Sequence, residues 1–159
     1  MPTPPFAPQG LEGPLIVSKP MRTRLQRFIR YPTAERRALS IALALLMMAR
    51  LLLRFLTVPV VRRAVAWCAP AVAPFPPRLA ELVTVAALQL PGVTTCLPRA
   101  IVLEGLLRAS GRPAELRIGV ASLPLVGRPD THAWVELDGV SLDETAKGYT
   151  PLPVFGTGV

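Results

Sequence analysis

The sequence has few of the residues on which metal centres and disulfide scaffolds depend. Its 159 residues include two cysteines and one histidine. A disulfide scaffold needs more cysteines than this, and a structural zinc site needs four ligands. We therefore expect no disulfide framework, no metal and no cofactor, and any histidine chemistry must come from His132.

Charged residues are also scarce, at 18 % of the chain, whereas hydrophobic residues make up 51 %. This balance excludes an intrinsically disordered chain, which has low hydrophobicity and high net charge. Nineteen prolines argue against many long helices. The length allows one globular domain with a helical extension.

Acidic residues are rarest in the first part of the chain. Residues 1–63 hold eleven Lys and Arg against two Glu, a net charge of +9, whereas residues 64–159 hold seven basic and eight acidic residues. Such asymmetry indicates two segments with different partners. A basic segment can meet nucleic acid, a lipid surface or an acidic protein. Because no aromatic residues are interleaved for base stacking, we expect no nucleic-acid partner.

The pattern of prolines and apolar residues predicts three regions. Residues 1–20 read as a proline-rich extended arm, 21–77 as a basic helical region, and 78–159 as a compact core. Helices are predicted at 21–30, from Thr33 to about Leu56, and at 60–68. The apolar run 38–49 is followed by Arg50, which disfavours a membrane-spanning helix. We interpret it as an amphipathic or buried helix, with a membrane-surface helix as the alternative.

In the core, helical patterns precede alternating ones. Asp138-Gly139 between two alternating runs is a strong β-hairpin signal. The predicted order is a helix at 78–90, a helix at 96–107 that Gly111 and Pro113 end, and strands at 116–120, 131–137 and 140–145. Helices followed by antiparallel strands define an α+β fold.

Cys96 is predicted to begin a helix, after Thr95 as a candidate cap. Free backbone N–H groups and the helix dipole at such a position stabilise a thiolate and can hold an oxyanion. The alternative is a buried, unreactive cysteine. Cys68, beside Trp67 in an apolar stretch, is expected to be of that second kind.

His132 lies on the more polar face of its predicted strand. With a two-residue turn, Trp134 pairs with Asp143, so that His132 and Asp143 project from the same face of the hairpin. A bulge would select Glu144 instead. Cys96, His132 and a carboxylate would supply a nucleophile, a base and a group that orients the base. The alternatives are a surface histidine and an ordinary hairpin charge.

Several motifs together resemble the lasso-peptide B proteins, the transglutaminase-like leader peptidases of bacterial lasso-peptide biosynthesis. The resemblance covers about residues 78–153. It rests on Cys96-Leu97-Pro98-Arg99-Ala100, the helix end at 106–111, the strand at 116–120, His132-Ala133-Trp134-Val135-Glu136 and Asp138-Gly139.

The resemblance implies a cysteine protease with a papain-like/transglutaminase-like core that cuts the leader from a ribosomally made precursor peptide. Cys96 would be the nucleophile and His132 the general base and acid. Relatives often place the third residue one position beyond Asp143, which keeps Glu144 as the alternative to the residue that the hairpin register favours.

The resemblance also implies partners in the cytoplasm. The chain looks like the split form of the family, which works with a separate leader-binding protein and precedes a macrolactam cyclase. The basic region would dock to either protein or to a membrane surface.

A non-catalytic peptide-binding module, attached to a biosynthetic complex or a membrane, is the competing hypothesis. An enzyme that transfers the acyl group to an amine is the third.

Overall fold

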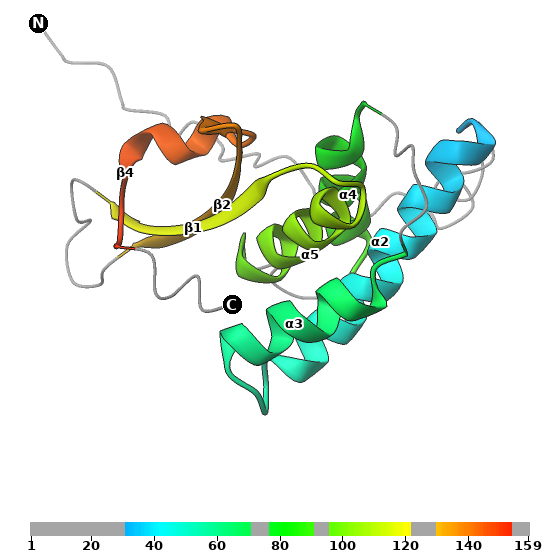
Figure 1. Ribbon diagram of the computed structural model, residues 1–159, viewed down its shortest axis with the longest axis horizontal. Helices are drawn as coiled ribbons and strands as arrows, with labels where there is room; N and C mark the ends of the chain where they lie inside the picture. The colour runs from blue at the N-terminus through cyan, green and yellow to red at the C-terminus, as the bar shows by residue number, and fades with distance from the viewer. Residues whose placement is uncertain (1–30, 71–76, 91–95, 122–129, 154–159) are drawn as a thin grey trace, which may run out of the picture. The chain divides into compact units, whose positions relative to one another are not determined.

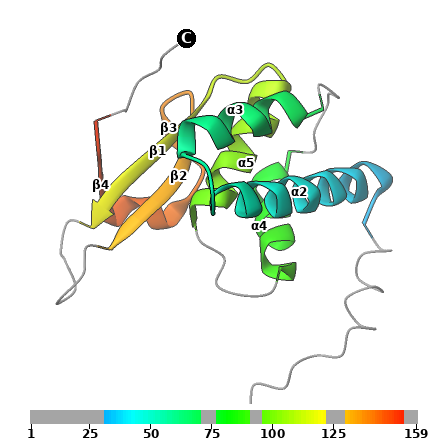
Figure 2. The same cartoon turned by 90° about the horizontal axis from the view of Figure 1, so that it is seen from below.

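The computed structural model describes residues 31–70, 77–90, 96–121 and 130–153, and there it confirms the α+β prediction. Four α-helices precede a four-stranded antiparallel sheet and lie to one side of it (Figures 1 and 2). The predicted arm at 1–20 and helix at 21–30 lie outside the described residues. The elements are α2 (Thr33–Leu52), α3 (Val58–Cys68), α4 (Leu79–Gln89), α5 (Cys96–Ala109), β1 (Ala114–Ala121), β2 (Thr131–Leu137), β3 (Val140–Ser141), the 3₁₀ helix η1 (Glu144–Gly148) and β4 (Tyr149–Pro151).

Helix α2 is amphipathic, as the apolar run predicts. It ends at Leu52, four residues earlier than expected. Beyond it the N–H groups of Arg54 and Phe55 bond to carbonyls three residues back, at 3.2 and 3.0 Å, as in a turn. Pro59 then lies in the first turn of α3, where its missing N–H costs nothing. No helix in the described ranges is long and apolar enough to cross a membrane. The buried face of α2 consists of Ala38, Leu39, Ala42, Leu45, Leu46 and Ala49.

Helix α5 is the centre of the packing, since it contacts α2, α3, α4, β1 and β2. Its residues from Ala100 to Leu107 are all buried. Gly105 explains how α3 comes so close: a Cβ at this position would lie only 2.8 Å from Cγ1 of Val65. The N-terminal end of this buried helix carries Cys96.

A buried carboxylate joins α5 to α3 and β1. Glu104 accepts two hydrogen bonds from Arg62, at 2.9 Å from Nε and 2.5 Å from Nη2, and one of 3.4 Å from the N–H of Leu116. Arg108 approaches the same carboxylate at 3.6 Å. The hydrogen bond to Glu104 raises the pKa of Arg62 against the opposing effect of burial. Glu104 is thus satisfied by several donors, as a buried charge must be.

The strand order is β3-β2-β1-β4, and every neighbouring pair is antiparallel. The predicted hairpin is confirmed: Leu137 pairs with Val140 across Asp138 and Gly139, whose φ angles of 52° and 77° are those of a type I′ turn. Glycine adopts such angles without strain.

The predicted returning strand at 140–145 is wrong beyond Ser141. Asp143 instead caps η1, because its carboxylate accepts a 3.0 Å hydrogen bond from the N–H of Thr145. Short polar side chains offer the backbone this alternative to a sheet ladder. The sequence pattern also missed β4, a three-residue strand that pairs with β1.

The expectation that Cys68 is buried is wrong as well. Helix α3 turns Val61 and Val65 into the core, and Cys68 is exposed. Its neighbour Trp67 is 90 % exposed. Both residues lie at the C-terminal end of a helix whose buried face is narrow.

Candidate active site

The half-buried Cys96 is the first residue of α5. Backbone N–H groups in the first turn of a helix have no helical partner, so they remain available to an oxyanion. The Cys96 thiol makes a long hydrogen bond of 4.0 Å to the carbonyl of Thr131, which precedes His132 in β2. The sulfur therefore lies beside the start of β2. The candidate cap Thr95 lies outside the described residues.

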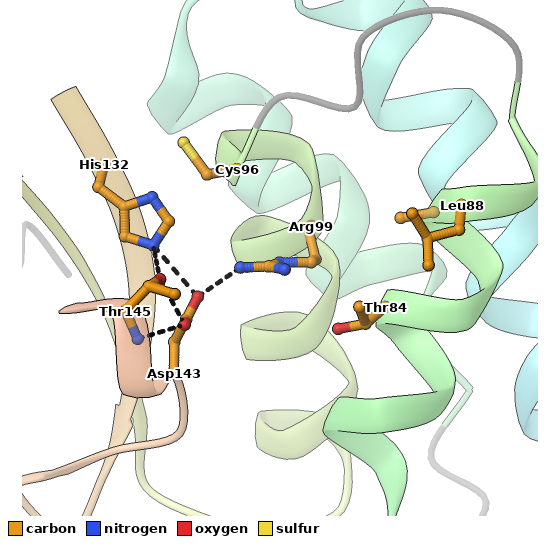
Figure 3. A pocket seen from close by; sticks show the side chains of 8 residues that line it. Thr84, Leu88, Cys96, Arg99, His132, Asp143 and Thr145 are labelled. Atoms are coloured by element: carbon orange, nitrogen blue, oxygen red, sulfur yellow. Dashed lines mark hydrogen bonds and ion pairs between the residues drawn. The ribbon is translucent and has the colours of Figure 1, made fainter. Parts of the chain in front are cut away.

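One nitrogen of His132 is held by two side chains that precede or begin η1. Nε2 lies 3.1 Å from Oδ2 of Asp143 and 3.1 Å from Oγ1 of Thr145. Thr145 in turn donates its hydroxyl to Oδ1 of Asp143 at 2.6 Å. The other ring nitrogen, Nδ1, lies on the side that faces the Cys96 sulfur (Figure 3). A proton on Nε2, donated to Asp143, leaves Nδ1 able to accept the thiol proton.

Asp143 is also paired with Arg99, whose Nη2 contacts the same oxygen, Oδ2, that His132 contacts. Burial would raise the pKa of Asp143, but hydrogen bonds from Thr145 and His132 and the charge of Arg99 outweigh it and hold that pKa below its usual value. Asp143 is thus ionised at neutral pH. An ionised carboxylate orients the imidazole and stabilises the imidazolium that forms when it takes a proton.

Two aromatic rings flank the imidazole. The ring centroid of Tyr149 lies 4.9 Å from that of His132, and the Trp134 ring is nearly parallel to it at 6.2 Å. The Tyr149 hydroxyl donates to Asp130 at 2.8 Å. This hydrogen bond, followed by burial and by the charges of Asp130, Cys96 and Asp143, raises the pKa of Tyr149.

The side chains of Cys96 and His132 face one cavity of about 320 Å³. The cavity is bounded by α4 on one side and by α5, β2 and the start of η1 on the other. Its remaining lining residues are Thr84, Ala87, Leu88, Arg99, Asp143 and Thr145. The nucleophile and base predicted from the sequence thus have space between α4 and β2 for a peptide bond.

The sequence offered two carboxylates, and the structure brings only one of them to the histidine. Asp143 is hydrogen-bonded to His132, whereas Glu144 is exposed and lines a second cavity. Sequence reasoning missed Arg99, Thr145 and Tyr149. Thr145 has a signal, the Asp-x-Thr spacing of a side-chain cap, and Arg99 follows Cys96 by about one helical turn. Tyr149 has no such signal.

Within the described ranges, no group of three or more His, Cys, Asp or Glu side chains is placed to hold a metal ion. In a comparison with known proteins, residues 39–154 match the family model described as the transglutaminase-like superfamily. No curated protein and no solved structure matches the chain. The family match begins inside α2 and includes every later described element. Because it spans well over half of the sequence, the chain belongs to the transglutaminase-like superfamily, which includes cysteine peptidases.

Proposed function

We propose that this protein is a cysteine peptidase that removes the leader from a lasso-peptide precursor, together with a separate leader-binding protein. The observation that carries the peptidase proposal is the cavity shared by Cys96 and His132, with Asp143 bonded to the far side of the imidazole. Membership of a superfamily that includes cysteine peptidases supports it. The choice of substrate rests on the resemblance of the Cys96 and His132 motifs to the lasso-peptide B proteins.

In this proposal the reaction proceeds through an acyl-enzyme. Nδ1 of His132 accepts the Cys96 proton while the sulfur attacks the carbonyl carbon at the leader–core junction. The N–H groups at the start of α5 stabilise the negative oxygen of the tetrahedral intermediate. His132 then gives the proton to the leaving amine, and the C–N bond breaks to release the core peptide. Water, deprotonated by His132, cleaves the thioester and releases the leader as a carboxylate.

The proposal assigns docking to the basic helical region. On α3, Val60 and Trp67 are 48 % and 90 % exposed, and Arg63 is exposed between them. Exposed apolar and basic side chains on one helix favour a partner there. The leader-binding protein, the cyclase and an anionic membrane surface are the three candidate partners, and binding measurements with each in turn distinguish them.

The test is cleavage of the precursor peptide by the purified protein mixed with the leader-binding protein. Mass spectrometry should show one cut at the leader–core junction with a free leader carboxylate. Cys96→Ala should produce no cut and should still bind the leader-bound partner. Cleavage by Cys96→Ala at the normal rate would contradict the proposal. A leader coupled to an amine would show that the enzyme transfers the acyl group instead of hydrolysing it.

A further inference from the structure

A second cavity, of about 400 Å³, lies next to the one that holds Cys96 and His132. Thr84, Arg99 and Asp143 line both cavities, so the two are neighbours along the groove between α4 and α5. The second cavity extends toward the start of α4, away from the Cys96 sulfur. A peptide whose scissile bond lies at Cys96 can therefore place another of its side chains here.

The second cavity combines apolar walls with acidic residues. Val85, Leu103, Trp134 and Leu142 contribute apolar surface. Glu81 and Glu144 also line it, and both are exposed. Such a lining suits a side chain with an aliphatic stem and a charged end.

The charges of the lining favour a cation. Arg99 is neutralised by its ion pair with Asp143. Glu81 pairs with the exposed Arg78 at 2.8 Å, and Glu144 forms no ion pair within the described part of the chain. With Asp143 paired to Arg99 and Glu81 paired to Arg78, the carboxylate of Glu144 is the unpaired charge among the described residues that line this cavity.

We propose that this cavity binds a lysine or arginine side chain of the peptide substrate, with Glu144 as the main partner of the cation. The inference rests on the proposed peptidase function and adds a substrate class to it. The stem would pack on Val85 and Leu103, and the charged end would reach Glu144 and Glu81. An acidic substrate side chain would be repelled. Glu144, the alternative carboxylate of the sequence analysis, thereby acquires a role in binding.

The geometry of α5 sets the position of that side chain. From Cys96 to Leu103 the helix rises about 10 Å, at about 1.5 Å a residue. An extended peptide covers this length in about three residues. The basic residue is therefore expected about three positions from the scissile bond.

The experiment measures binding, so that it does not depend on cleavage. Cys96→Ala is titrated into fluorescein-labelled peptides that span the leader–core junction, and anisotropy gives Kd. Each peptide carries lysine, norleucine or glutamate at one of the positions two to four residues from the junction, on either side. At one position lysine should bind about three- to fivefold more tightly than norleucine, the range of an exposed ion pair. Added salt should reduce that difference.

Variants assign the preference to the cavity. Adding Glu144→Gln should remove the lysine preference, and Glu144→Lys should reverse it in favour of glutamate. Glu115→Gln is the matched control, because Glu115 is an exposed carboxylate on β1 that lines neither cavity. It should keep the preference in full.

The outcomes separate the inference from the proposed function. The inference is overturned if no position prefers lysine, or if Glu144→Lys keeps the preference. The same substitutions are then placed in the full precursor peptide, which is given to the protein with Cys96 intact together with the leader-binding protein. A lysine preference in binding without any cleavage would support the lysine-binding cavity and contradict the peptidase proposal. Cleavage of all peptides with equal binding would support the peptidase and contradict the lysine-binding cavity.

Discussion

The carboxylates of Glu104 and Asp143 are each bound by an arginine, at different depths. The Glu104 side chain on α5 is 4 % exposed. Its partners are Arg62 on α3, the N–H of Leu116 on β1 and Arg108 on α5 itself. Asp143 is 18 % exposed, and its partners His132 and Arg99 line the cavity with Cys96. The same kind of pairing thus joins elements of the core at Glu104 and, in the proposed mechanism, orients the base His132 at Asp143. Substitutions of the two should affect different properties.

The largest expected effect is on activity, in Asp143→Asn. The amide no longer stabilises an imidazolium and allows the wrong tautomer of His132, so kcat should fall about a thousandfold. Because the side chain is partly exposed and the Thr145 N–H keeps an acceptor, the free energy of unfolding should fall by only about 1 kcal/mol. Precursor cleavage and urea unfolding measure the two. A normal kcat would show that Asp143 does not orient the base.

Glu104→Ala should have the opposite profile. It leaves Arg62 and the Leu116 N–H without their acceptor, which should lower the free energy of unfolding by about 3 kcal/mol. Urea unfolding measures this, with Glu115→Gln as an exposed control expected to change by less than about 0.5 kcal/mol. A loss of stability no greater than that of the control would contradict the claim that Glu104 stabilises the fold.

In the proposed mechanism Arg99 is a positioning residue, and its substitution should have a smaller effect on activity. Arg99→Met removes a charge that helps to lower the pKa of Asp143. We expect kcat to fall about tenfold, which corresponds to about 1.4 kcal/mol. The acid limb of the kcat/KM profile should move to higher pH, because Asp143 then takes up a proton at higher pH. Arg99→Lys should restore most of the lost activity. An unchanged pH profile in Arg99→Met, with only lower stability, would assign Arg99 to packing alone.

The smallest effect is the dependence of stability on pH. The pKa of Asp143 is lower in the folded than in the unfolded protein. The stabilisation of the fold by ionised Asp143 is therefore complete above the pKa of about 3.9 that this group has in the unfolded protein. It is lost as the pH falls through the lower pKa of the folded protein. Wild type and Asp143→Asn should differ more in free energy of unfolding at pH 6 than at pH 3. An equal difference at both would show that the ion pairs of Asp143 do not stabilise the fold.

Local signals in the sequence predicted much of the fold. The start of α5 at Cys96 and the Asp138-Gly139 hairpin depend on nearest neighbours, and the structure has both. The predicted hairpin register selected Asp143 over Glu144, but it assumed a strand where the chain forms the capped 3₁₀ helix η1. The carboxylate reaches His132 by a different local structure.

Other features depend on contacts between residues far apart in the chain. Arg99 meets Asp143 across 44 positions, and β4 is defined only by its pairing with β1. Cys68 looked buried because its neighbours are apolar, whereas burial on α3 depends on which face meets α5. None of these could be read from composition or periodicity.

The most direct test of the account is the rate at which iodoacetamide alkylates Cys96 at neutral pH. Cys68→Ser removes the second, exposed thiol and leaves one reactive position to follow by mass spectrometry. In this background Cys96 should react rapidly, and His132→Ala should slow the reaction at least about tenfold by removing the proton acceptor. Equal rates with and without the imidazole would contradict the claim that His132 activates Cys96.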